Sequence, residues 1–159
     1  MPPSEERTKL GGWRRRLPSN TIVDYWALEE TYAFKVRLFA PSLANLPKTT
    51  VFTINACYFS LTSYRIHERH ATTDIIRKRI AFNCRDYLQV FPELQSFRAL
   101  DYAERLGYGL EEEVKQFIIG TVKRSSRDEF ARTVTKLRPD VASTAVLALI
   151  GKHLPELTD

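Results

Sequence analysis

The fold of this chain is decided by residues 92–137, PELQSFRALDYAERLGYGLEEEVKQFIIGTVKRSSRDEFARTVTKL. Apolar residues recur there at helical spacing, between residues that start or stop helices. Pro92 suits the first turn of a helix, and Gly107 suits the position just after its last turn. Ser126 precedes Glu129 by three residues, which is the spacing of a capping box. The stretch therefore predicts three short helices joined by brief turns.

Further helices are expected on both sides of this stretch. Upstream, Thr72 or Thr73 caps a helix whose apolar stripe passes through Ile76 and Ile80 and continues past residue 84. Downstream, Pro139 opens a last helix that ends near Gly151. The links between these helices are short, so neighbouring helices pack closely as a compact bundle.

Residues 21–70 are expected to contain β-structure. The segment from Phe34 to Leu38 alternates apolar and basic residues with period 2, which is typical of a half-buried strand. Residues 49–66 are rich in β-branched and aromatic residues, which favours strands, although their apolar positions also fit a buried helix. We therefore predict an α+β fold, mainly α, with a small β-containing N-terminal part (21–70) followed by a compact bundle of about five short helices (71–159). These two parts form a single globular domain over 21–159.

Residues 1–20 are expected to form a flexible basic N-terminal arm outside that domain, because prolines and glycines interrupt any periodic element. The arm contains Trp13 followed by Arg14, Arg15 and Arg16. An aromatic ring beside three guanidinium groups suits contacts with bases and phosphates. The alternative is that Trp13 only attaches the arm to the body of the protein.

The charge of the chain favours a polyanionic partner. Its 24 Lys and Arg residues against 19 Asp and Glu residues give a net charge of +5. Arg outnumbers Lys 16 to 8, and residues 1–20 and 61–100 each carry a net charge of +3. Arginine forms bidentate contacts with phosphate and stacks on aromatic planes, so this bias fits nucleic acid.

A second basic segment runs from Arg65 to Arg85. If the helix that begins at Thr73 continues to Arg85, then Arg77, Lys78 and Arg85 line a basic face beside the apolar stripe. Such a face binds phosphates or is simply solvated. Tyr64 is the aromatic candidate for base stacking. The candidate nucleic-acid-binding residues are Trp13, Arg14, Arg15, Arg16, Tyr64, Arg65, Arg69, Arg77, Lys78, Arg79 and Arg85.

No motif for catalysis, cofactor binding or metal binding stands out. The sequence has no GxSxG, no GxxxxGK[ST] and no GxGxxG. His67 and His70 together with Cys57 and Cys84 lack the close pairing of zinc ligands, and both cysteines are expected to be buried thiols. We therefore predict a protein that is not an enzyme and has no cofactor and no metal.

These features lead to one functional prediction and two alternatives. We predict a small protein that binds nucleic acid with low specificity, with RNA favoured because no helix-turn-helix is visible, and that assembles as a homo-oligomer on its ligand as coat or nucleocapsid proteins do. One alternative is a structural or adaptor protein that acts through its C-terminal helices. The other is a peripheral matrix-type protein that contacts anionic membrane through the arm. With no secretory signal and no transmembrane segment, we expect a soluble intracellular protein, cytoplasmic, nuclear or within a virion.

Overall fold

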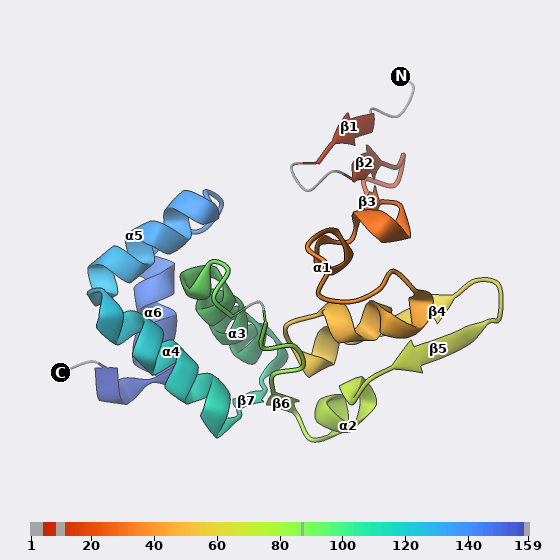
Figure 1. The fold of residues 1–159 in the computed structure, drawn as a ribbon. Coiled ribbons are helices and arrows are strands. Elements are labelled where there is room, and N and C mark those ends of the chain that lie inside the picture. Colours follow the sequence, from red (N-terminus) through yellow and green to blue (C-terminus); the bar gives the residue numbers. More distant parts are fainter. Residues whose placement is uncertain (1–4, 9–11, 87, 158–159) are drawn as a thin grey trace. The chain divides into compact units, whose positions relative to one another are not determined.

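The structure is a computed structural model that describes residues 5–8, 12–86 and 88–157. Its contacts divide the chain into two compact units, residues 1–49 and residues 50–159. Figure 1 shows the helices and strands of both units along the chain. Because the two units are not placed relative to one another, each is described by itself.

The first unit is built on a three-stranded antiparallel sheet of order β1-β2-β3. Its strands are β1 (Glu5–Arg7), β2 (Trp13–Arg16) and β3 (Ile22–Tyr25), and every residue in them is exposed. A 3-10 turn (Leu28–Glu30), the short helix α1 (Tyr32–Lys35) and a second 3-10 segment (Leu43–Thr49) follow. The buried residues of these later elements are Ala33, Phe34 and Pro47.

The first unit differs from the sequence prediction in two places. Strands β1 and β2 lie within residues 1–20, where we expected a flexible arm, although residues 1–4 and 9–11 of that arm lie outside the described residues. The predicted strand from Phe34 to Leu38 is wrong, since α1 occupies its start and Arg37 has a φ of 59°. The period-2 pattern misled because Val36 and Leu38 remain 45% and 39% exposed and share no buried face with Phe34.

The second unit opens with a 3-10 turn (Thr53–Asn55) and an antiparallel hairpin. The hairpin strands are β4 (Cys57–Ser60) and β5 (Arg65–Glu68), and they are followed by α2 (Ala71–Ile76). Strand β6 (Arg79–Ile80) then pairs in parallel with β7 (Gly109–Leu110), which lies about thirty residues further along the chain. The open question over residues 49–66 is thus settled as a 3-10 turn and a strand pair.

The predicted long helix from Thr73 past residue 84 is wrong. Helix α2 ends at Ile76, and Lys78 has a φ of 50°, which no α-helix accommodates. Ile80 is fully buried in the pairing with β7, whereas Ile76 is 75% exposed. The apolar residues have helical spacing in the sequence but do not form one buried helix face, because Ile76 lies exposed at the end of α2 and Ile80 is buried in β6.

Four helices complete the second unit, with α3 in contact with each of the other three. They are α3 (Pro92–Leu106), α4 (Glu112–Arg124), α5 (Arg127–Leu137) and α6 (Ser143–His153), followed by a 3-10 turn (Pro155–Leu157). Figure 1 shows α4, α5 and α6 gathered near α3. Fully buried apolar side chains from all four helices form the core: Leu100, Val114, Ile118, Phe130, Val134, Val146 and Ile150.

The predicted helix boundaries in this bundle are confirmed at several ends. Pro92 lies at the start of α3, and Gly107 ends it with a φ of 65°. The Ser126 hydroxyl accepts a hydrogen bond from the backbone N–H of Glu129 at 3.2 Å, as a capping residue does. The last helix begins at Ser143, four residues later than Pro139 predicted. The α+β class, mainly α, is confirmed.

Candidate nucleic-acid interface

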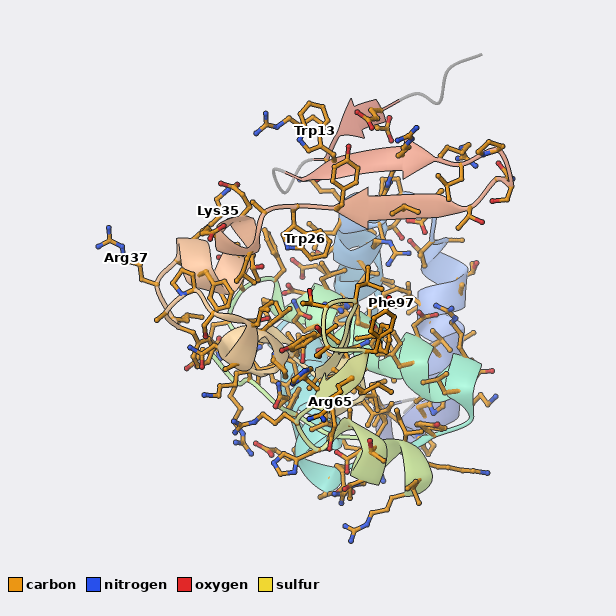
Figure 2. All side chains as sticks on the ribbon, turned by 90° about the vertical axis from the view of Figure 1, so that its right-hand side faces the viewer. Trp13, Trp26, Lys35, Arg37, Arg65 and Phe97 are labelled. Atoms are coloured by element: carbon orange, nitrogen blue, oxygen red, sulfur yellow. The ribbon has the colours of Figure 1, made fainter. Side chains whose placement is uncertain are left out.

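The hairpin β4–β5 and the residues after it present exposed cations without acidic partners. Arg65 lies on β5 (Figure 2), Arg69 follows that strand, and Arg77 and Lys78 follow α2. Within the described residues, none of these four side chains forms an ion pair or a side-chain hydrogen bond. Unpaired exposed cations keep their full charge available for phosphates. We call these four residues the cationic surface of the second unit.

Arg79 does not belong to this surface, because it is engaged in an internal ion-pair cluster. Its Nε lies 2.5 Å from Asp74 Oδ1, and its Nη1 lies 2.9 Å from Glu111 Oε1. The Asp74 side chain is only 2% exposed, and Arg79 is its one ion-pair partner in the described structure. The hydrogen bond to Asp74 raises the pKa of the Arg79 guanidinium further above its usual value. Arg79 thus connects α2 to the start of α4, and its guanidinium is occupied by these internal ion pairs.

Arg85 is also paired. Its Nε and Nη2 donate to the two carboxylate oxygens of Glu113 at 2.5 and 2.6 Å, a bidentate contact between the loop after β6 and α4. That hydrogen bonding holds the pKa of Glu113 below its usual value. Helix α2 ends at Ile76. The helix face that the sequence predicted for Arg77, Lys78 and Arg85 therefore does not exist.

The basic cluster of the first unit is divided by the geometry of its strand. Successive side chains of a strand point to opposite faces, so Trp13 and Arg15 lie on one face of β2 and Arg14 and Arg16 on the other. Arg14 donates two 2.7 Å hydrogen bonds to Asp24, and the pKa of Asp24 is lowered as a result.

The other groups of this cluster also have local partners. Arg15 lies 3.7 Å from Glu5, and Arg16 donates to Asn20 Oδ1 at 2.7 Å. Trp13 has the guanidinium of Arg7 5.4 Å from its ring centre, and Figure 2 labels this tryptophan on the sheet. Arg14 and Arg15 are therefore partly neutralised by acidic residues of their own sheet, whereas Arg16 donates to a neutral amide and keeps its charge.

The hairpin carries exposed apolar and aromatic groups beside its free cations. In its register, Tyr58 pairs with His67 and Phe59 pairs with Ile66. The rings of Tyr58 and His67 stack at 4.7 Å with an interplanar angle of 8°. Four large apolar or aromatic residues in or next to the turn of the hairpin are more than half exposed: Phe59 at 53%, Leu61 at 77%, Tyr64 at 78% and Ile66 at 71%.

Sequence reasoning found Tyr64 but missed its three neighbours Phe59, Leu61 and Ile66. The sequence does show that both hairpin strands contain apolar residues. Such residues are normally buried in the core, so their apolar character alone does not indicate an exposed group. Only the turn that places Tyr64 beside Phe59, with ring centres 6.4 Å apart, shows that these residues form one exposed group. We call Phe59, Leu61, Tyr64 and Ile66 the hairpin tip.

Each unit also contains an open pocket. The pocket of the first unit, about 520 Å³, is lined by both tryptophans, Trp13 and Trp26, and by the ion pairs Arg14–Asp24 and Lys35–Glu30. The pocket of the second unit, about 320 Å³, lies between the turn at Asn55 and the end of α3. Opposite charges balance in the first pocket, so it offers no net attraction to phosphate.

The chemistry of cysteines and metals adds little to this interface. Cys84 is buried as predicted, but the prediction for Cys57 is wrong, since this residue is exposed on β4. Within the described residues, no three His, Cys, Asp or Glu side chains come together as a metal site. In the same residues, no helix has the length and apolar character that crossing a membrane requires.

Comparisons with known proteins reveal similarity in fold only. No protein-family model matches the chain, and no curated protein matches its sequence. Among solved structures, a tRNA nucleotidyltransferase complexed with a primer tRNA and an incoming ATP analogue has 18% identity and a TM-score of 0.59, over 99% of this chain and 47% of its own. The Thermotoga maritima CCA-adding enzyme complexed with tRNA has 14% identity and a TM-score of 0.58, over 99% of this chain and 37% of its own. A tRNA-processing enzyme in an apo form has 20% identity and a TM-score of 0.57, over 95% of this chain and 43% of its own.

These similarities correct the functional prediction. The chain shares its fold, along nearly all of its length, with part of the structure of tRNA-processing enzymes, and it spans less than half the length of those proteins. The prediction of a non-enzymatic coat-like or nucleocapsid-like protein is therefore wrong, as is the prediction that the protein is not an enzyme. Sequence motifs could not reveal this relationship because identities of 14–20% leave no shared pattern long enough to recognise.

Proposed function

We propose that this chain is part of a tRNA nucleotidyltransferase and contributes contacts with the tRNA. The observation that carries the proposal is the match of 95–99% of the chain to solved tRNA-processing enzymes at TM-scores near 0.6. Several enzymes of this kind were solved with tRNA or with a nucleotide bound. A fold alone does not define an activity, so the surface chemistry of this chain has to support the proposal separately.

The cationic surface supplies that support. Arg65, Arg69, Arg77 and Lys78 are exposed and unpaired within the described structure, unlike Arg79 and the arginines of β2. Four cations that each neutralise one phosphate give a slope of log K against log[salt] of roughly −3. We therefore assign phosphate contacts to these four residues and assign Arg79 and Arg85 to holding α2, the loop after β6 and α4 together.

The remaining predicted contacts make a smaller contribution. Arg14, Arg15 and Arg16 each have a partner within the first unit, so an RNA phosphate has to compete with Asp24, Glu5 or Asn20. Trp13 is 40% exposed and offers part of its ring for contact. We propose an intracellular role, which follows from tRNA as the partner, and one copy of the chain per tRNA as the simplest stoichiometry.

A binding experiment tests the proposal. The full chain is titrated with a fluorescent tRNA transcript that lacks its terminal CCA, at several salt concentrations, with a DNA duplex of similar length as competitor. We expect a preference for the tRNA, a slope near −3, and a loss of about one unit of slope in Arg65→Gln or Arg69→Gln. Arg132→Gln is the matched control, because Arg132 is an exposed arginine of α5 without an ion pair in the described structure.

The same transcript tests the enzymatic part of the proposal. It is incubated with the chain, Mg²⁺ and labelled CTP, and the product is examined for growth at its 3′ end. An extended product would assign nucleotide transfer to this chain itself. Equal affinity for tRNA and duplex DNA, or a salt slope that the arginine variants leave unchanged, would refute the assignment of tRNA binding to this surface.

A further inference from the structure

Tyr64 combines high exposure with an unfavourable backbone conformation. It lies in the turn between β4 and β5 with a φ of 52°, and its side chain is 78% exposed. A bulky residue in the left-handed region is strained, whereas Gly or Asn adopts it readily. Burial does not compensate for the strain, because most of the ring is in solvent. Apart from one edge-to-face contact with Phe59, folding of the hairpin gives little reason for a tyrosine at this position.

The neighbours of Tyr64 hold its ring in place without covering it. The Phe59 ring lies edge-to-face with Tyr64 at 6.4 Å and 74°. Leu61 and Ile66 remain 77% and 71% exposed on the same hairpin. An aromatic ring that is fixed and open to solvent is the feature on which nucleic-acid bases stack.

The charges around the ring favour a polyanion. Arg65 follows Tyr64 directly, Arg69 lies at the end of β5, and neither has an ion pair in the described structure. Along β5, Arg65 and His67 lie on one face, and Ile66 and the acidic Glu68 lie on the other, where Glu68 accepts a long 3.4 Å contact from the Thr72 N–H. Arg65 therefore borders the Tyr64 turn from the face of the hairpin opposite to the Phe59–Ile66 pair.

We propose that Tyr64 stacks on an unpaired nucleobase of single-stranded RNA while Arg65 contacts a neighbouring phosphate. This inference rests on the proposed function and goes beyond it, because it assigns to the hairpin tip the recognition of an unpaired segment and not of the duplex. Stacking requires a base that is free of a pairing partner, so duplex RNA gains nothing from Tyr64.

The experiment compares two probes and one informative substitution. The probes are a fluorescent oligoadenylate of about 12 nucleotides, which spans a typical single-strand site, and its duplex with oligouridylate. In Tyr64→Asn, we expect affinity for the single strand to fall about 5- to 150-fold and affinity for the duplex to stay within about twofold, because one base stack is lost. The salt slope should not change, because no cation is removed.

The same substitution separates function from folding. Because Asn tolerates a positive φ, relief of strain in Tyr64→Asn should offset the loss of the Phe59 ring contact, so the unfolding temperature should stay close to that of the wild type. Tyr64→Phe and Tyr64→Trp keep a ring and should keep the single-strand affinity. If Tyr64→Asn unfolds at a lower temperature, the Phe and Trp variants decide, since they restore binding only if the ring itself acts.

Phe91 provides a matched control. It is also an exposed aromatic residue with a positive φ, at 55% and 54°, but Val90 and Pro92 flank it and no unpaired arginine does. Phe91→Asn should relieve similar strain and leave binding to both probes unchanged. If Phe91→Asn weakens single-strand binding as much as Tyr64→Asn, the assignment to Tyr64 is refuted.

Other outcomes also overturn the inference. A loss below twofold in Tyr64→Asn, or equal losses for single strand and duplex, removes the stacking role. Self-association that Tyr64→Asn abolishes, with RNA affinity unchanged, would make the tip a protein-binding surface instead. If the oligonucleotide test fails but the wild type still binds tRNA with the expected salt dependence, the inference is refuted and the proposed function stands. If the wild type does not prefer tRNA over duplex DNA, the proposed function is refuted whatever the oligonucleotide test gives.

Discussion

Replacing Arg79 with methionine should destabilise the second unit far more than an exposed arginine would. The change keeps the length and apolar stem of the side chain but removes the guanidinium that lies 2.5 Å from Asp74. The Asp74 side chain, 2% exposed, then has no charged partner and no access to water. An isolated buried charge of this kind costs about 3–5 kcal/mol when its partner is removed.

The opposite substitution should cost less, and this asymmetry is the specific prediction. In Asp74→Asn the buried group is neutral, and the guanidinium of Arg79 keeps its 2.9 Å contact with Glu111 and partial access to water. We expect about 1–2 kcal/mol for the weakened hydrogen bond at Asp74. In the double variant Arg79→Met with Asp74→Asn, the loss should be well below the sum of the two single losses, because no buried charge is left unpaired.

Urea unfolding followed by far-UV circular dichroism measures these free energies. Arg85→Met is the control, because the Arg85–Glu113 pair has the same bidentate chemistry with both side chains more than half exposed, and it should cost less than about 1 kcal/mol. Equal losses for Arg79→Met and Asp74→Asn, or a loss for Arg79→Met no larger than for Arg85→Met, would refute the reasoning.

Substitutions at three further positions test features of the helices. Gly107→Ala should cost about 1 kcal/mol in urea unfolding, because the φ of 65° is strained for alanine although no atom lies near the added Cβ; an unchanged midpoint would mean that the turn relaxes. Ser126→Ala should cost about 1 kcal/mol through loss of the cap of α5, and Ser126→Asp should restore it. Hydrogen bonds from Lys152 and His153 lower the pKa of Glu104 below its ordinary value of 4.5. The ionised carboxylate therefore stabilises the fold fully when the pH is above 4.5, and this stabilisation is lost as the pH falls through the lowered pKa. In Glu104→Gln, thermal unfolding should therefore depend less on pH in the acid range, and an unchanged acid profile would exclude this contribution.

The helical bundle could be predicted because its signals are local. Pro92, Gly107 and Ser126 act within one turn of the backbone, and the apolar spacing between them satisfies only a helix. The α+β class followed from the same evidence. The helix predicted after Thr73 failed because Ile80 is buried by β7, a strand that lies far along the chain and has no local signature.

The candidate site was only partly visible for a related reason. Sequence reasoning selected arginines by type, and Arg65 and Arg79 are indistinguishable on that basis. The tertiary structure separates them, because Asp74 and Glu111 converge on Arg79 while Arg65 meets no acid among the described residues. Burial and ion pairing between distant residues cannot be deduced from composition or spacing.

The similarity in fold to tRNA-processing enzymes also became visible only in three dimensions. At 13–20% identity most residues at matching positions differ, and one fold accommodates many different core sequences. The sequence by itself determined the helices of the bundle from α3 to α6, the ends of α3, the cap of α5 and the excess of arginine. The tertiary structure alone decided where α2 ends, which cations are free and which fold the chain shares, because each of these depends on contacts between residues far apart in the chain.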